Sequence, residues 1–172
     1  AFFILVLVFG ALVAAFIPVV IAVLSIVLAL GVTSLIGQGF QLSFFVVNMI
    51  TMMGLAVGID YSLFVVSRYR EERRKGLDKI AAIARSGATA SRTVFFSGMT
   101  VVLALLGMLI VPASVFVSLA TGAILVVLSS VLAALTLLPA LLSLLGDKVD
   151  ALRIPLIQRA HARYDETKRG GF

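Results

Sequence analysis

The charged residues of this chain are gathered in two segments, and the tracts before and between these segments are apolar. Asp60 is the only charged residue before position 68; eleven charged residues fall in 68–92, none in 93–146 and ten in 147–172. A helix needs about 20 consecutive apolar residues to cross the hydrocarbon core of a bilayer, and each apolar tract has room for at least two such helices. The sequence therefore predicts an integral membrane protein.

The composition agrees with this class and excludes several others. Charged residues make up 13% of the chain, hydrophobic residues 62%, and the mean hydropathy is +1.20, whereas charged residues are about 25% of a soluble domain. The chain has no cysteine and a single histidine, His161, so we expect no metal site and no cofactor. The net charge of +6 indicates orientation, since Lys and Arg mark the cytoplasmic flanks of spans, and we expect no nucleic-acid partner.

No stretch alternates with the period of two residues that a membrane β-barrel needs, so we predict an all-α, polytopic membrane helix bundle. Its four full spans and one truncated N-terminal span are expected at residues 1–9 (partial), 12–36, 44–67, 94–111 and 115–145. Residues 1–36 leave an alternative open, because they could instead form one long tilted helix that is kinked at Pro18. The chain opens directly in apolar sequence, and we interpret it as a piece of a longer protein.

The segment 68–92 holds eight basic and three acidic residues and is predicted to be a cytoplasmic loop. Within it, apolar residues recur at helical spacing from Leu77 to Ala88, which predicts a short amphipathic helix along the membrane interface. This helix links two spans or, alternatively, passes conformational change between them. The last segment, 147–172, is predicted to be a cytoplasmic linker, so residues 1–146 form the membrane domain.

Asp60 places a carboxylate inside an apolar span. A charged side chain near the centre of a bilayer helix costs at least about 2.5 kcal/mol, so such residues are usually functional. Asp60 lies eight residues before Arg68, about 12 Å along a helix, which is too deep for its short side chain to reach the aqueous interface. We interpret Asp60 as a group that takes up and releases a proton. The alternative is a structural role, in which it is hydrogen-bonded to Ser97 or Thr100 of the next span.

The residues around Asp60 separate onto different faces of the helix at about 100° per residue. Small residues gather on one face, which should let a neighbouring helix approach closely; they are Thr51, Gly54, Gly58 and Ser62. Asp60 lies on another face, and the adjacent Tyr61 points about 100° away from it. Each of these two side chains can therefore reach a different neighbour, which implies a second bundle of helices as a partner.

Three segments of the chain resemble one family. Residues Met53 to Glu72, with sequence MGLAVGIDYSLFVVSRYREE, resemble the fourth transmembrane helix of the MMPL transporters of the resistance-nodulation-division superfamily. Ala88–Gly98 resembles the entry to the fifth helix, and Leu137–Leu142 resembles the end of the sixth. Nearly the whole chain therefore resembles helices two to six of the first half of such a transporter.

The resemblance implies a proton-driven exporter of lipids or other hydrophobic compounds in a bacterial inner membrane. It implies two similar membrane halves, in which an Asp-Tyr pair from each half meets at the centre and relays protons, the coupling ion. Asp60 is then the proton carrier and Tyr61 its hydrogen-bonding companion. The expected partners are membrane lipid, a hydrophobic substrate and the second half, which lies outside this sequence together with the extracytoplasmic domains. The chain alone is therefore not expected to transport.

Two other functions are alternatives to export. A lipid-sensing or scaffolding module, similar to a sterol-sensing domain, has the same helical architecture, and Asp60 is then structural. An intramembrane aspartyl protease needs two carboxylates that share a proton. Asp60 is the only acidic residue in the predicted spans, so we do not expect an enzyme.

Overall fold

The computed structural model describes residues 12–39 and 42–145, and every long element in these ranges is an α-helix. The elements are α2 (Leu12–Gly37), α3 (Phe45–Arg74), α4 (Lys79–Leu106), the short 3-10 helix η1 (Gly107–Ile110) and α5 (Ser114–Leu145). Four helices in the described ranges are long and apolar enough to cross a membrane, which confirms the predicted all-α membrane bundle. The partial span at 1–9 and the linker at 147–172 lie outside the described residues, as does the choice between one and two spans in 1–36.

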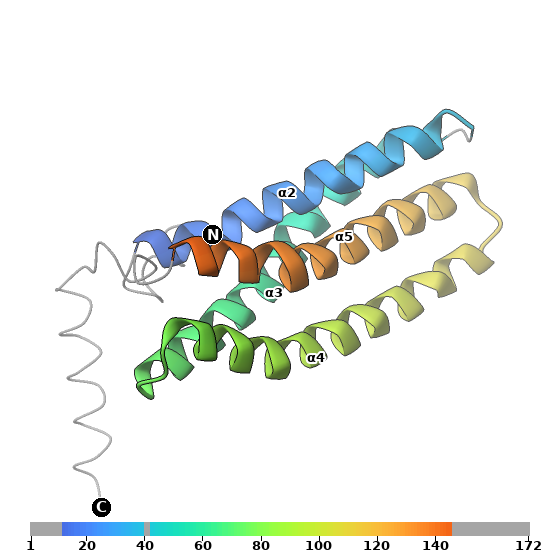
Figure 1. Ribbon diagram of the computed structural model, residues 1–172. Coiled ribbons are helices and arrows are strands. Elements are labelled where there is room, and N and C mark those ends of the chain that lie inside the picture. Colours follow the sequence, from blue (N-terminus) through green and yellow to red (C-terminus); the bar gives the residue numbers. More distant parts are fainter. Residues whose placement is uncertain (1–11, 40–41, 146–172) are drawn as a thin grey trace, which may run out of the picture.

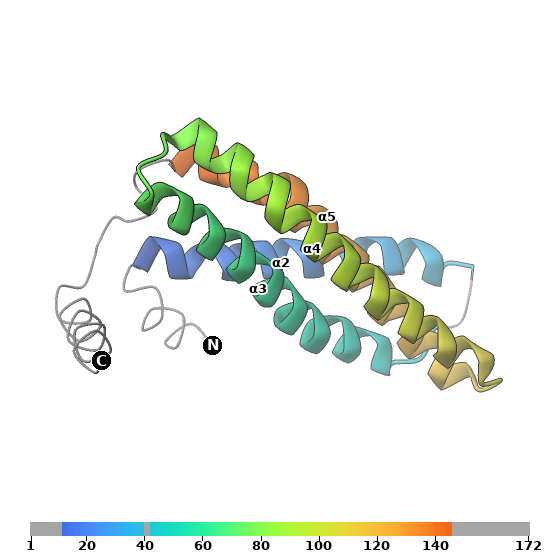
Figure 2. The same cartoon turned by 90° about the horizontal axis from the view of Figure 1, so that it is seen from below.

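The four long helices lie side by side, and consecutive helices run in opposite directions (Figure 1, Figure 2). Helices α3 and α5 each contact the other three, while α2 and α4 flank this central pair. The start of α2, the turn between α3 and α4 and the end of α5 share one end of the bundle. We call it the charged end, because the charged residues from Arg68 to Arg85 lie there.

Many small side chains lie in the interior of the bundle, beside a few large ones such as Ile21, Ile50 and Leu138, and many large apolar side chains point outward. Buried small residues of α2 and α5 include Ala15, Ala22, Ser25, Ala29, Ala120, Gly122, Ala123, Ser130 and Ala134. Exposed large residues include Phe16, Val27, Leu103 and Leu132, which are each about 60% exposed. In a membrane, small residues let helices pack by close backbone approach while lipid covers the large apolar groups. This distribution is therefore the one expected of a bundle in a bilayer.

The segment 68–92 differs from its prediction, because it contains a tight turn where we expected a loop and a separate interfacial helix. Helix α3 continues past Ser67 to Arg74, and α4 begins at Lys79 and runs without a break through the amphipathic residues into the apolar span. Gly76 has a φ of 88°, the left-handed conformation that often ends a helix. Asp78 caps α4, since its side chain accepts a hydrogen bond of 3.2 Å from the Ala81 amide.

The physical reason for this difference is that stop and start signals are present only between Lys75 and Asp78. The charged residues that follow Ser67 are mostly Arg, Glu and Lys, which are good helix formers, so α3 has no cause to end at the membrane boundary. No proline separates the amphipathic part of α4 from its apolar part. The amphipathic segment is therefore the first part of a helix that also forms the next candidate span.

At the opposite end of the bundle, α2 ends at Gly37 and α3 begins at Phe45. The Ser43 amide donates a hydrogen bond of 3.0 Å to the Ser118 hydroxyl, and that hydroxyl donates one of 2.7 Å to the Ser114 carbonyl. These two bonds tie the connection before α3 to the first turn of α5. Pro112 lies between η1 and α5, close to where we expected a reversal of the chain.

Candidate functional site

Asp60 lies near the middle of α3 and points away from the helices of the bundle. The buried residues Gly58 and Ser62 are each about 160° from Asp60 around the helix, at about 100° per residue, so Asp60 is opposite the packed face. Its side chain is exposed, and it makes no hydrogen bond or ion pair with any described residue. Among the described residues the Asp60 carboxyl group thus has no partner, and it lies on an apolar outer face of this unit.

Tyr61 takes a different direction from its neighbour Asp60. It is half-buried, packs against the main apolar core, and turns toward α4. Its hydroxyl oxygen lies 3.4 Å from the position that a Cβ on Gly98 would occupy. The atom nearest to that position is Val131 Cγ2 of α5, which a Cβ would overlap, so Gly98 lets Val131 approach α4 closely while the Tyr61 phenol lies beside it in ordinary contact. The side chains of Asp60 and Tyr61 therefore point in different directions, as their angular separation on the helix predicted.

The two hydroxyl residues considered as neighbours of Asp60 both lie on the exposed side of α4. The Thr100 hydroxyl donates a hydrogen bond of 2.8 Å to the Phe96 carbonyl. Ser97 is exposed and precedes Gly98, the residue beside Tyr61. Among the described residues neither hydroxyl is bonded to Asp60. The hydrogen bond on which a purely structural role of Asp60 depends is therefore absent from the described part of the chain.

The small-residue face of α3 is where α2 and α5 come closest. A Cβ on Gly58 would lie 2.7 Å from the Ala22 Cα, and one on Gly54 would lie 2.5 Å from Ile26 Cγ1 and 2.7 Å from Val126 Cγ2. One turn further along, Ser62 is buried, and its hydroxyl donates a hydrogen bond of 2.6 Å to the Gly58 carbonyl. Helices α2 and α5 pack against this face of α3, and Asp60 lies on the opposite face.

Thr51 does not belong to this packed face, although its angular position on an ideal helix predicts that it should. It is exposed, and its hydroxyl donates a hydrogen bond of 2.8 Å to the Val47 carbonyl. The buried positions of α3 are Val46, Ile50, Gly54, Gly58, Ser62, Val65 and Tyr69, among others. Their spacing of mostly four residues exceeds the helical repeat of about 3.6. The buried stripe therefore drifts around α3, because α3 crosses its neighbours at an angle, and Thr51 falls outside it.

A buried carboxylate with several basic partners lies at the charged end. The Glu72 side chain is 1% exposed, and its oxygens lie 3.3 Å from an Arg68 nitrogen, 2.9 Å from Lys75 Nζ and 3.6 Å from Arg85 Nε. Lys75 also pairs with Glu71 at 2.8 Å. These hydrogen bonds, to Glu71 first and to Glu72 second, raise the pKa of Lys75, so its ammonium group stays charged. Because Arg85 belongs to α4, Glu72 links the two helices across their turn.

We expect Glu72→Gln to destabilise the protein more than Glu71→Gln. The first change removes a buried charge that faces three cations, which should lower the free energy of unfolding by about 1–3 kcal/mol. Glu71 is 48% exposed, and a surface ion pair contributes about 1 kcal/mol or less. Thermal unfolding of the full-length protein in detergent, with each variant beside the wild type, measures the difference. Equal unfolding temperatures for the two variants would contradict the role assigned to Glu72.

Glu72, Gly98 and the contact between Glu72 and Arg85 were not predicted from the sequence. Glu71 and Glu72 are adjacent acids in a basic segment, and the pattern alone does not separate the buried one from the exposed one. A usable signal was present for part of the cluster, since Arg68, Glu72 and Lys75 have the i, i+4 and i, i+3 spacing of helical ion pairs. That spacing becomes informative only once α3 is known to continue beyond Ser67.

The geometry defines a class of protein. In the described ranges, four antiparallel helices of membrane-spanning length, closely packed through small residues and with an apolar outer surface, make this a multi-pass α-helical membrane protein. Within the described ranges, no group of three or more His, Cys, Asp or Glu side chains is placed to hold a metal ion.

The chain belongs to the MMPL family, whose sequence model matches residues 1–166. This confirms the resemblance seen in the segments around Asp60, Gly98 and Pro139. The chain is 43% identical over 143 residues to the mycolic acid-containing lipids exporter MmpL11 of Mycolicibacterium smegmatis, an alignment that covers 83% of the chain and 15% of that protein. It is 38% identical over 147 residues to the trehalose monomycolate exporter MmpL3 of the same species, covering 86% of the chain and 14% of that protein.

A third relative carries a different functional name. The heme uptake protein MmpL11 of Mycobacterium tuberculosis is 41% identical over 140 residues, covering 81% of the chain and 14% of that protein. The chain thus spans about one-seventh of the length of these curated relatives. Their names differ in the compound carried and in the direction of transport, so similarity in this region places the chain in the family without specifying a cargo.

Proposed function

We propose that this chain is the membrane core of one half of an exporter of lipids or other hydrophobic compounds, driven by the proton-motive force. Asp60 is the proton carrier, and Tyr61 is the hydrogen-bonding companion in the same relay, in which each Asp faces the Tyr of the other half. No cofactor takes part, since the proton is the coupling ion, and the chain performs no enzymatic chemistry. The lipid exporters among its relatives support the substrate class.

The observation that carries this proposal is the exposure of Asp60 on an outer face without a partner in the described residues. A carboxylate facing lipid near the middle of a span costs at least about 2.5 kcal/mol. This cost is relieved when a second membrane half covers the face and supplies a hydrogen-bonding group. Tyr61 diverges from Asp60 toward α4, so the partner of Asp60 in this proposal comes from the second half.

Protonation gives this site a means of coupling. The neutral carboxylic acid and the charged carboxylate differ strongly in how well an apolar interface tolerates them. A proton therefore changes the relative stability of two arrangements of the halves, which is what coupling to transport requires. The basic charged end is proposed to face the cytoplasm and the protein to lie in a bacterial inner membrane, with protons entering Asp60 from the opposite side.

Export by the full-length protein should stop when the proton gradient is removed. We expect a protonophore to abolish delivery to the cell surface of the radiolabelled lipids that a strain lacking the gene fails to export, with that strain as the background. Cells in which respiration is slowed but the gradient is maintained provide the control for general energy loss. Delivery that continues unchanged in the protonophore would contradict the proposal and favour a lipid-sensing or scaffolding role.

A further inference from the structure

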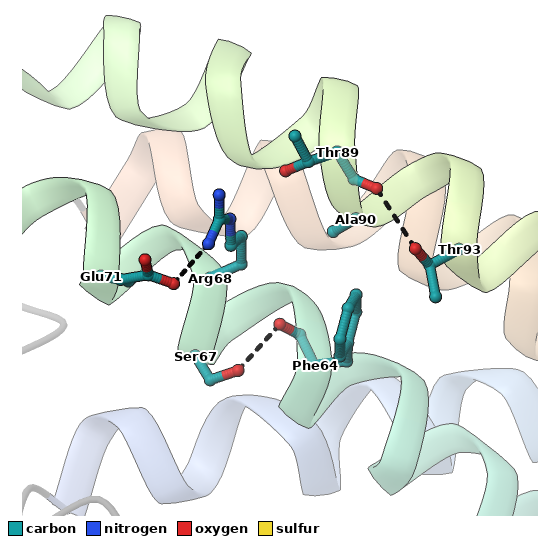
Figure 3. A pocket seen from close by; sticks show the side chains of 7 residues that line it. All are labelled: Phe64, Ser67, Arg68, Glu71, Thr89, Ala90 and Thr93. Carbon is teal, nitrogen blue, oxygen red and sulfur yellow. Dashed lines mark hydrogen bonds and ion pairs between the residues drawn. The ribbon is translucent and has the colours of Figure 1, made fainter.

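A pocket of about 330 Å³ opens between α3 and α4 near the charged end. Figure 3 shows the residues that line it: Phe64 and Arg68 extend from α3 toward Thr89 and Thr93 on α4, and Ser67 and Glu71 lie beside them on α3. The volume is sufficient for several water molecules. Hydroxyl, carboxylate and guanidinium groups lie on its walls among apolar atoms, which make up the larger part of its surface.

The hydroxyl groups of the pocket are set to accept hydrogen bonds. Ser67 donates its hydrogen to the Phe64 carbonyl at 2.9 Å, Thr89 to the Arg85 carbonyl at 3.0 Å, and Thr93 to the Thr89 carbonyl at 3.5 Å. Each oxygen therefore keeps its remaining acceptor capacity for a molecule in the pocket.

This set of groups favours water or protonated water over an anion. An anion needs donors, and the guanidinium of Arg68 already pairs with Glu71 at 2.5 Å and with Glu72 at 3.3 Å. Glu71 is itself paired with Arg68 and with Lys75, so these two partners balance its charge, and the hydroxyl oxygens of the walls can accept hydrogen bonds from water or hydronium. The walls thus match a chain of waters that carries protons.

Along the axis of α3, the pocket lies between Asp60 and the charged end. Phe64 is one turn beyond Asp60, about 6 Å along the axis, and Glu71 is about 10 Å further. On α4, Ser97 lies one turn beyond Thr93 and adjoins Gly98, which is beside Tyr61. Ser97 therefore reaches approximately the level of Asp60, and polar groups extend from that level to the charged end.

We propose that this pocket is the water-filled access through which Asp60 exchanges protons with the charged-end side of the membrane, with Glu71 as the carboxylate at its mouth. The proposal rests on the function proposed for Asp60. In the release step, the O–H bond of the Asp60 carboxylic acid breaks and its proton passes to a water oxygen. The proton then moves through the waters of the pocket to bulk solvent, and Asp60 remains as a carboxylate.

Water in the pocket can be tested by cysteine labelling. The 172 residues contain no cysteine, so a full-length protein cleared of any cysteine elsewhere reports on single positions. We expect Thr93→Cys and Ser67→Cys to react with a small, membrane-impermeant, cationic thiosulfonate added from the charged-end side. The matched control is Phe95→Cys, which is two residues from Thr93, 47% exposed and outside the pocket. Labelling of Thr93→Cys should be at least about tenfold faster, because the reactive thiolate forms where water is present.

Proton flow through the pocket needs a second measurement. Thr93→Leu fills the pocket with apolar atoms and should slow proton flux into proteoliposomes at least about tenfold, by removing waters that the Thr93 hydroxyl holds. Thr136→Leu is the control, since Thr136 is also exposed and donates to the carbonyl four residues back, but lies on α5. The Thr136→Leu variant should keep the wild-type rate.

The labelling rates and the proton flux can each overturn the proposed proton access. Equal labelling rates at positions 93 and 95 would overturn the water-filled pocket. Rapid labelling combined with an unchanged flux in Thr93→Leu would show a wet pocket that lies off the proton route, which also overturns the proposal. Neither labelling rate depends on transport. A failure of the function proposed for Asp60 would instead appear as unchanged flux in Asp60→Asn, with labelling of Thr93→Cys still rapid.

Discussion

Asparagine in place of Asp60 is expected to reduce proton-coupled transport by the full-length protein to the level of empty liposomes. Asn48 shows that the exposed side of α3 accommodates an asparagine, and Asp60 makes no hydrogen bond within the described bundle that the change would break. The substitution removes the titratable group and keeps nearly the same size and shape. Loss of transport would therefore reflect the lost proton site, since helix packing in this unit stays intact.

The measurement uses full-length protein in proteoliposomes that contain the polar lipids of its own cells, with a pH-sensitive dye enclosed and a pH gradient imposed. Asp60→Glu is the matched control, because it keeps a carboxyl group on a side chain one methylene longer, and it should retain part of the flux. Equal amounts of folded protein are verified by size-exclusion chromatography. Wild-type flux in the Asp60→Asn variant would refute the proposed role of this residue.

The second large effect is expected at Gly58, where even one methyl group should destabilise the bundle. A Cβ at this position would lie 2.7 Å from the Ala22 Cα and 2.9 Å from its Cβ, so the backbone of α2 has to move. Overpacking a tight core costs about 1–3 kcal/mol. We place Gly58→Ala near the upper end of that range, because the atom in the way belongs to a backbone and cannot rotate aside.

Gly31→Ala is the matched control for Gly58→Ala. Gly31 is a helical glycine of α2, is exposed, and has no neighbouring atom within 4 Å of an added Cβ. Its replacement should leave the free energy of unfolding unchanged or raise it by up to about 1 kcal/mol, because alanine is the better helix former. Thermal unfolding of the full-length variants in the same detergent compares the two. If both alanine variants unfold at the wild-type temperature, α2 and α3 do not pack as closely as described.

The sequence predicted the helical architecture well, and the reason is physical. A bilayer requires each spanning segment to satisfy its backbone hydrogen bonds internally, so long apolar tracts become helices whatever their detailed packing. The bounds of α2 and α5 accordingly fall within one residue of the expected spans 12–36 and 115–145. The depth of Asp60 and its divergence from Tyr61 depend only on helical geometry and were also predictable.

Features that depend on tertiary contacts were not predictable in the same way. The drift of the buried stripe on α3 depends on how α3 crosses its neighbours, so Thr51 was wrongly placed on the packed face. The burial of Glu72 depends on α4 lying over the end of α3, which requires the tight turn at Gly76. The charged residues after Ser67 predicted that the span ends there. Arg, Lys and Glu mark the flank of a membrane span but do not end a helix, so the continuation of α3 was not predicted.

The continuity of α4 has a consequence for the proposed mechanism. One helix joins Arg85, which contacts Glu72, to Gly98, which lies beside Tyr61. The charged end and the level of Asp60 are thus connected by a single rigid element as well as by the pocket. A movement of α4 would alter both the contact with the phenol and the walls of the proposed proton access.

The central claim is that Asp60 takes up and releases a proton, and infrared difference spectroscopy tests it most directly. Spectra of the full-length protein in lipid, recorded between acidic and alkaline buffer, report the carbonyl stretch of protonated carboxylic acids. We predict a band that appears on acidification in the wild type and in Tyr61→Phe, and that is absent in Asp60→Asn. A difference spectrum that is identical in the wild type and in Asp60→Asn would contradict the claim.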